Sequence, residues 1–334
     1  MWKKKLTVKE KEEINEKRKQ DIENAFKMIE SGVKEYLTSD KYISVLKNIS
    51  KFHHYSFNNS LLIMMQHPTA SAVASFASWK SNFNRSVKKD EKGIKIFVPI
   101  EYKIYEPKID PMTKEEILDK DGEPVKEYKG EKGITYKIGY VFDIEQTKQI
   151  EGKEIIPLTF DVHELSGNVM NYKSILKSLI NISPVPIEFE KFESNAKGYF
   201  SPSTERIVVQ PDMSELQTLK TVIHETAHSI LHNKQNLQEL KSKGIEFSSE
   251  DKETQAESVA FIVAYHYGFD TSEYSFPYVA TWAENPKLIN NNMEIIQKTS
   301  DYIIEELDKD LEQQKIKGVE QNPAIEEEEL EMEM

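Results

Sequence analysis

The string HETAH at residues 224–228 constrains this chain more than any other feature, because it lies inside a segment with the apolar periodicity of a helix. Residues four apart leave a helix on the same face, one turn apart, so both imidazoles can share one metal ion. Glu225 then stands beside the metal, in position to take a proton from an attacking water. The surrounding residues are largely apolar, and two unpartnered histidines in a core would be costly. The pattern therefore predicts His224 and His228 as zinc ligands and Glu225 as general base.

The third zinc ligand must be His, Asp or Glu, because the chain contains no cysteine. His232 is eight residues from His224, about 12 Å along a straight helix, which is too far for zinc bonds of about 2 Å to both. The helix predicted to start near residue 248 offers Glu253 and Glu257, four residues apart on one face. We expect Glu253 to bind zinc and Glu257 to accept a hydrogen bond from a ligand histidine, as in gluzincins. The competing assignment makes Glu257 the ligand.

The net charge of −13 hides a strong segregation of charge along the chain. Residues 1–110 carry +7, whereas residues 111–300 and residues 301–334 carry −10 each. Taken alone, the net charge of −13 argues against a nucleic-acid partner. The positive charge of residues 1–110 is compatible with one.

Residues 50–95 interleave basic and aromatic side chains, the combination by which single-strand binders hold the backbone and stack bases. The competing interpretation places the aromatic rings in a core and leaves the lysines on a solvated surface. The candidate contacts to single-stranded DNA are Tyr55, Trp79, Arg85, Lys88, Lys89 and Lys92.

The remaining patterns predict an α+β chain. Helical periodicity covers residues 8–30, 166–181 and 289–314, and alternating strand patterns cover residues 94–98 and 135–144, with an exposed hairpin at 106–132 between them. We expect an N-terminal domain over 1–155, a second domain over 156–316 that holds the metal site, and a disordered acidic tail over 317–334. No apolar run approaches the length of a membrane span, and the N-terminus lacks a signal core, so we expect a cytoplasmic protein.

Several segments carry a family resemblance. The string KETQAESVA at 252–260 resembles the second zinc motif of ImmA/IrrE-type metallopeptidases and of ArdC antirestriction proteins, and residues 274–282 resemble the LtrC-like branch. Four further segments resemble N-terminal blocks of ArdC, with Asp90 where the block usually has glycine: residues 55–63, 79–80, 87–94 and 141–147. The resemblance implies an N-terminal single-stranded DNA-binding domain, a zincin-like metallopeptidase domain, and a role on mobile elements in protecting incoming DNA from restriction.

Three functions follow from these features. The first is zinc-dependent hydrolysis of a peptide or protein, with His266, Tyr265 or Tyr199 as candidates to stabilise the oxyanion. The second is protective DNA binding with a structural or vestigial zinc site, and the third is an ImmA-like regulatory protease that cleaves a repressor. Glu225 favours catalysis, since a structural site needs no general base. The sequence indicates no particular oligomeric state.

Overall fold

The computed structural model describes residues 8–37, 41–156, 169–193, 195–269, 271 and 286–321. Within these residues the chain mixes helices and sheets, which confirms the predicted α+β class. The segment 274–282 and the acidic residues 322–334 lie outside the described part. The last helix continues to Gln321, past the predicted start of the tail at residue 317.

The N-terminal half combines helices with a small antiparallel sheet in the order β1-β4-β3, and a second pair formed by β2 and β5. Its helices are α1 (Val8–Tyr36), α2 (Tyr42–Lys51), α3 (Phe57–Gln66) and α4 (Phe76–Asn82). Its strands are β1 (Val73–Ser75), β2 (Arg85–Val87), β3 (Ile94–Pro107), β4 (Lys126–Asp143) and β5 (Thr147–Gln149), with a 3₁₀ turn η1 (Ile144–Gln146) before β5.

The end of β4 is fixed by the fully buried carboxylate of Asp143. It accepts hydrogen bonds from the backbone N–H groups of Ser71 (2.8 Å), Ala72 (3.1 Å) and Glu145 (2.9 Å). Asp143 thereby caps η1 and ties it to the chain before β1. This role explains why an aspartate stands at this position of the 141–147 segment.

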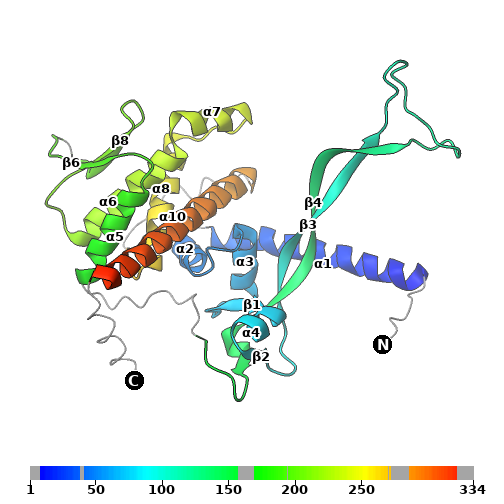
Figure 1. Cartoon of the computed structure of the whole chain (residues 1–334), viewed down its shortest axis with the longest axis horizontal. Helices are drawn as coiled ribbons and strands as arrows, with labels where there is room; N and C mark the ends of the chain where they lie inside the picture. The colour runs from blue at the N-terminus through cyan, green and yellow to red at the C-terminus, as the bar shows by residue number, and fades with distance from the viewer. Residues whose placement is uncertain are drawn as a thin grey trace.

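Strands β3 and β4 form a long ribbon that projects from the body of the molecule (Figure 1). Their register runs from Ile94 opposite Val141 to Pro107 opposite Lys126, with an irregularity between Lys103 and Tyr105. The tip beyond β3 is held by isolated bridges and turns. The exposed hairpin predicted at 106–132 is therefore present, at the end of this arm.

The C-terminal half places helices against a three-stranded sheet in the order β6-β8-β7, in which β6 is parallel and β7 antiparallel to β8. Its strands are β6 (Ile187–Phe189), β7 (Gly198–Ser201) and β8 (Arg206–Val209). Its helices are α5 (Val169–Ile182), α6 (Glu215–Leu231), α7 (Lys234–Ser242), α8 (Ser249–His266) and α10 (Pro286–Gln321). Helix α7 lies in a connection for which no helix was predicted.

The two helices that carry the metal motif begin at side-chain caps. Ser214 accepts from the N–H of Gln217 at the start of α6, and Ser248 and Asp251 form a reciprocal capping box at the start of α8. These caps satisfy backbone donors that a helix start leaves open, and they fix which residues face the partner helix.

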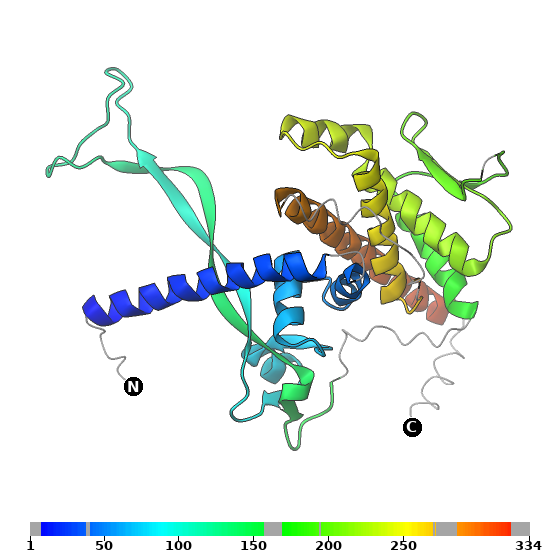
Figure 2. The same cartoon turned by 180° about the vertical axis from the view of Figure 1, so that it is seen from behind.

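One apolar core runs through both halves of the chain. It contains buried residues of α1, α2 and α3 together with buried residues of α6, α8 and α10. The hydroxyl of Tyr42 on α2 lies 3.0 Å from Ser258 Oγ on α8, and both residues are fully buried. Figure 2 shows α2 beside α8 and α10. The domain boundary at residue 155 stays a prediction, and the segments on either side of it share this core.

Candidate metal centre

Helix α6 and helix α8 bring three ligand atoms together. The Nε2 atoms of His224 and His228 lie 3.1 Å apart. The carboxylate of Glu253 places Oε2 3.5 Å from His224 Nε2 and Oε1 3.4 Å from His228 Nε2. The structure thus gathers the two histidines of the HETAH string and the first of the two candidate glutamates.

These separations fit a small divalent metal ion. Metal–ligand bonds of about 2.0–2.1 Å at tetrahedral angles put the ligand atoms about 3.3–3.4 Å from one another. The three measured distances scatter around that value. Two imidazoles and a carboxylate are also the donor set of a catalytic site with an open fourth position.

Glu257 lies behind His224, on the side away from Glu253. Its Oε2 contacts His224 Nδ1 at 3.1 Å, and its Oε1 contacts Lys220 Nζ at 2.6 Å. In the neutral ring that a metal ligand requires, a carboxylate at Nδ1 favours the tautomer that keeps a proton there and leaves the lone pair of Nε2 toward Glu253. Burial disfavours charge on His224, but the carboxylates of Glu253 and Glu257 outweigh it and raise the pKa of this imidazole to about 9.

His232 orients His228 from behind. Its Nε2 lies 2.8 Å from Gln255 Oε1, and Gln255 Nε2 donates to Asn292 Oδ1 at 2.5 Å. His232 Nε2 therefore carries the proton, so its Nδ1 accepts the 2.8 Å hydrogen bond from Nδ1 of His228. This leaves the lone pair of His228 Nε2 facing the ligand cluster. Burial lowers the pKa of His232 to about 4, which keeps it neutral in this role.

His232 lies beside His228 and not among the three gathered ligand atoms, and this supporting position was not predicted. The four-residue spacing from His228 was a visible signal that the two rings share a face. Gln255, which fixes the tautomer, comes from the other helix and could be assigned only from the packing of α8 on α6.

Glu225 is 7% exposed and lies where α6 meets β7. Burial raises the pKa of its carboxyl group, against the opposing effect of the two histidines. The close approach of β7 requires Gly198, because a Cβ there would lie 2.7 Å from Thr221 Cγ2 and 3.3 Å from Glu225 Cγ.

A cavity of about 480 Å³ opens over these groups and is bounded by β7, α6 and α8. Strand β7 is the edge of its sheet, and among the described residues no strand pairs with its other side, where an extended peptide could add. Tyr199 on β7 lines this cavity.

The structure does not place the two other candidates for oxyanion stabilisation at the cavity. Tyr265 and His266 lie at the far end of α8, and His266 is thirteen positions after Glu253, which corresponds to about 20 Å along the helix. His266 instead contacts the ring of His53, with centroids 4.8 Å apart, and Tyr265 stacks on Phe261. Tyr199 is the only one of the three at the cavity.

The predicted DNA contacts separate into buried and exposed groups. Trp79 is fully buried, and its Nε1 donates to the carbonyl of Phe142 at 2.7 Å, so its ring is not accessible to bases in this structure. Tyr55 is half-buried, with its hydroxyl donating to the carbonyl of Val73 at 3.2 Å. Arg85 is half-buried on β2, where its Nε donates to Thr147 Oγ1 at 2.7 Å.

Lys88, Lys89 and Lys92 are exposed on the connection between β2 and β3. Asp90, at the centre of that connection, has a φ of 66°. This is the left-handed conformation that glycine adopts most easily and that Asp tolerates better than most residues. Asp90 therefore holds a conformation that a glycine at this position would also adopt.

Two family models match consecutive parts of the chain. Residues 9–142 match the N-terminal domain of anti-restriction factor ArdC, and residues 181–275 match the IrrE N-terminal-like domain of the M78 peptidases. A curated relative, an uncharacterized protein of Bacillus anthracis, is 30% identical over 355 residues, covering 96% of this chain and 56% of the relative. The chain thus spans little more than half the length of that relative.

Two crystal structures of the antirestriction ArdC protein from plasmid R388 also align with the chain. The metal-free structure is 16% identical and covers 75% of this chain and 85% of its own, with a TM-score of 0.42. The Mn(II)-bound structure is 13% identical and covers 76% and 84%, with the same TM-score. Among the described residues, none of the helices is both long and apolar enough to cross a bilayer.

Proposed function

Because the chain is ArdC-like and also carries an IrrE N-terminal-like domain, we propose that it is a single-stranded DNA-binding, zinc-dependent metallopeptidase that acts as an antirestriction protein of a mobile element. The observation that carries the enzymatic part is the convergence of His224 Nε2, His228 Nε2 and Glu253 beside the buried Glu225, under the free edge of β7.

His224, His228 and Glu253 would hold the metal, while Glu257 and His232 keep the two imidazoles in the ligating tautomer. A zinc ion bound there supplies a Lewis acid that polarises a peptide carbonyl and lowers the pKa of a water molecule. The extended substrate would pair with the backbone of β7, which brings its scissile bond over the α6 histidines.

Glu225 would move the proton. Its carboxylate takes a proton from the attacking water and gives it to the leaving nitrogen. Its raised pKa makes it a stronger base than an exposed glutamate, which suits both transfers. The hydroxyl of Tyr199, 38% exposed at the cavity, is the candidate donor to the oxyanion.

The DNA-binding part rests on the exposed lysines of the β2–β3 connection. Lys88, Lys89 and Lys92 offer three cations close together in a basic region of the chain, and such groups bind phosphates without reading sequence. Since Trp79 is buried, base stacking must use other rings, of which the half-buried Tyr55 is the candidate that remains.

The decisive experiment compares Glu225→Gln with His224→Ala in the full chain. Metal content is measured by mass spectrometry, cleavage on an unstructured peptide library, and DNA protection in cells challenged with unmodified incoming DNA. Glu225→Gln should keep zinc and lose cleavage, whereas His224→Ala should lose zinc. Exposed Glu239→Gln serves as the matched control and should change neither the zinc content nor the cleavage activity.

Two results would revise the proposal. Full DNA protection by a cleavage-dead Glu225→Gln would make DNA binding the operative function and leave the metal site without a catalytic role in protection. Failure of the wild-type protein to retain zinc after metal-replete purification would overturn the metallopeptidase assignment itself.

A further inference from the structure

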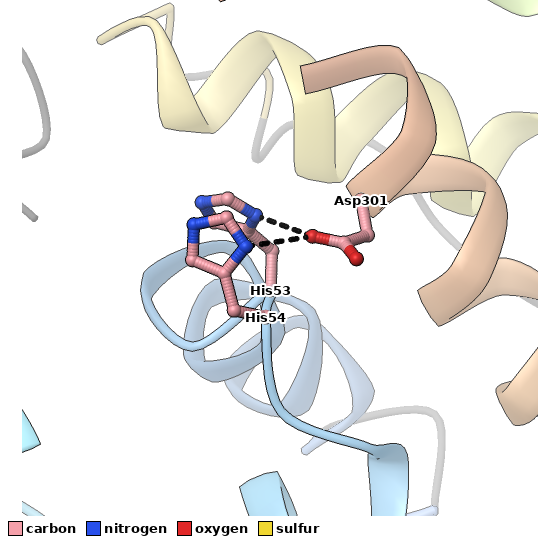
Figure 3. A group of neighbouring side chains, drawn as sticks. All are labelled: His53, His54 and Asp301. Carbon is pink, nitrogen blue, oxygen red and sulfur yellow. Dashed lines mark hydrogen bonds and ion pairs between the residues drawn. The ribbon is translucent and has the colours of Figure 1, made fainter. Parts of the chain in front are cut away.

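A second group of metal-ligating side chains lies where the turn after α2 meets α10, outside the HETAH centre. It consists of His53 and His54 on the turn and Asp301 on α10 (Figure 3). The ring of His266, at the opposite end of α8 from Glu253, contacts His53. Three of the eight histidines of the chain therefore meet at this junction.

The two adjacent imidazoles converge on one carboxylate oxygen. His53 Nδ1 lies 2.8 Å and His54 Nδ1 3.1 Å from Asp301 Oδ1. The ring centroids are only 3.8 Å apart, and Figure 3 shows both Nδ1 atoms pointing toward Asp301. Glu305, one turn further along α10, places Oε1 3.8 Å from His54 Nδ1. These separations are close to the spacing of about 3.3 Å that ligands take around one small cation.

The same junction holds buried polar atoms without partners. Gln297 is one turn before Asp301 and 3% exposed; its Nε2 donates to the carbonyl of His53 at 2.6 Å, but its Oε1 has no hydrogen-bond partner among the described residues. Ser300 Oγ, next to Asp301, and Ser50 Oγ on α2 are fully buried and equally unpartnered there. Buried polar groups are normally satisfied, so these three oxygens show that the described residues leave part of the polar junction without partners.

The candidate site is accessible to a cation from solvent. The side chains of His54, Asp301 and Glu305 are 52%, 29% and 45% exposed, while His53 is buried at 7%. His54 also lines a second cavity, of about 400 Å³, next to β1. The arrangement has a buried anchor, an open side and carboxylates to offset the charge of the ion, as a binding site requires.

We propose that His53, His54 and Asp301 form a second divalent-metal site, with Glu305 as an outer carboxylate, that links α2 to α10. Two imidazoles with carboxylates suit Zn²⁺, Co²⁺ or Ni²⁺ rather than Mg²⁺, which prefers oxygen ligands alone. The ion would tie the N-terminal helices to the last helix of the chain and stabilise the core that the two halves share.

The test measures the number of metal ions bound per full chain by equilibrium titration with Zn²⁺. A parallel titration uses Co²⁺, whose binding is monitored by its visible absorption. The wild-type protein should bind two ions per chain. The double variant His224→Ala/His228→Ala should still bind one, and its thermal midpoint should rise with Zn²⁺ but not with Mg²⁺. Adding His54→Ala to it should weaken that remaining site at least 100-fold. His54 is half-exposed, so its removal should leave the fold intact, and circular dichroism checks this.

The half-buried His67→Ala, added to the same double variant, is the matched control and should leave one ion bound. The proposal is overturned if the folded double variant binds no Zn²⁺, or if His54→Ala leaves its binding unchanged. Because these variants lack the HETAH ligands, the outcome does not depend on whether the first site is catalytic.

Discussion

Glu257 Oε2 lies 3.1 Å from Nδ1 of His224, although the two residues belong to different helices and are 33 positions apart. The contact fixes the ring from the side opposite to Glu253, so the two glutamates of α8 have different relationships to the same histidine. Lys220, one turn before His224, holds the other oxygen of Glu257 at 2.6 Å.

The two glutamates should therefore differ on substitution. Removing a supporting carboxylate costs about 10–100-fold in metal affinity, so we expect Glu257→Gln to weaken zinc binding within that range. Glu253→Gln removes a ligand and should weaken it further. Competition with a chromophoric chelator measures both, and equal losses, or a larger loss for Glu257→Gln, would reverse the assignment of the ligand.

His232 should matter for metal binding without touching the ion. His232→Ala removes the acceptor for His228 Nδ1–H and frees the ring to turn, so zinc affinity should fall about 10–100-fold with the helix otherwise intact. Gln255→Ala should lower zinc affinity by less than His232→Ala does, because it leaves His232 in place and only removes the group that fixes its tautomer. A His232→Ala protein with wild-type zinc affinity would contradict the orienting role.

Gly198 should be intolerant of even one methyl group. In Gly198→Ala the new Cβ would lie 2.7 Å from Thr221 Cγ2 and 3.0 Å from the carbonyl oxygen of Val208. Overpacking of this kind costs about 1–3 kcal/mol in the free energy of unfolding, measurable by urea denaturation. Adding Thr221→Ser removes Cγ2 and should recover part of the loss. If the double variant is no more stable than Gly198→Ala, the contact with Thr221 is not the cause.

The lysines of the β2–β3 connection should account for part of the salt dependence of DNA binding. For single strands the logarithm of affinity falls with that of salt by about 0.7 for each phosphate contact, so replacing three lysines by Gln should flatten the slope by up to about 2. The variant is Lys88→Gln/Lys89→Gln/Lys92→Gln, measured by fluorescence anisotropy with a labelled oligonucleotide. An equal change of charge on α7 and its C-cap is the control and should leave the slope unchanged: Lys234→Gln, Lys241→Gln and Lys243→Gln.

Tyr42 should make the protein sensitive to alkali. Full burial raises the pKa of its hydroxyl well above the usual range, against the hydrogen bond to Ser258. The unfolded chain therefore ionises this group at a lower pH than the folded protein does. The contribution of Tyr42 to the free energy of unfolding is fully present below about pH 10 and falls as the pH rises beyond it. Tyr42→Phe should cost about 1 kcal/mol at neutral pH from the lost hydrogen bond.

The measurement is urea unfolding between pH 8 and pH 11. The gap between wild type and Tyr42→Phe should narrow as the pH rises, because the variant has no buried hydroxyl to ionise. The exposed Tyr302→Phe is the control and should follow the wild type at every pH. A gap that is constant with pH would show that Tyr42 does not contribute to alkaline unfolding.

The sequence was most informative where a pattern is local. The starts of α6 and α8 follow from Ser214 and Ser248, and the four-residue spacings put His224 with His228, and Glu253 with Glu257, on shared faces. The alternation in residues 94–98 and 135–144 predicts only the base of the ribbon, because β3 continues to Pro107 and β4 begins at Lys126.

The parts that sequence did not reveal depend on which elements pack together. Trp79 and the lysines near it have similar local surroundings, and only the position of α4 against β4 decides that the ring is buried. His266 has the chemistry of a catalytic helper, but the length of α8 carries it away from Glu253 and next to His53. Neither outcome is encoded in the neighbouring residues.

The core that joins α2 to α8 and α10 also sets the order in which the chain can fold during synthesis. The apolar faces of the first helices leave the ribosome long before residues 286–307, against which they finally pack, have been made. Until then these faces are exposed to solvent and to other chains, a state that favours aggregation or chaperone binding. A polypeptide whose translation stops before α10 should therefore be degraded as a whole, rather than leave a stable N-terminal product.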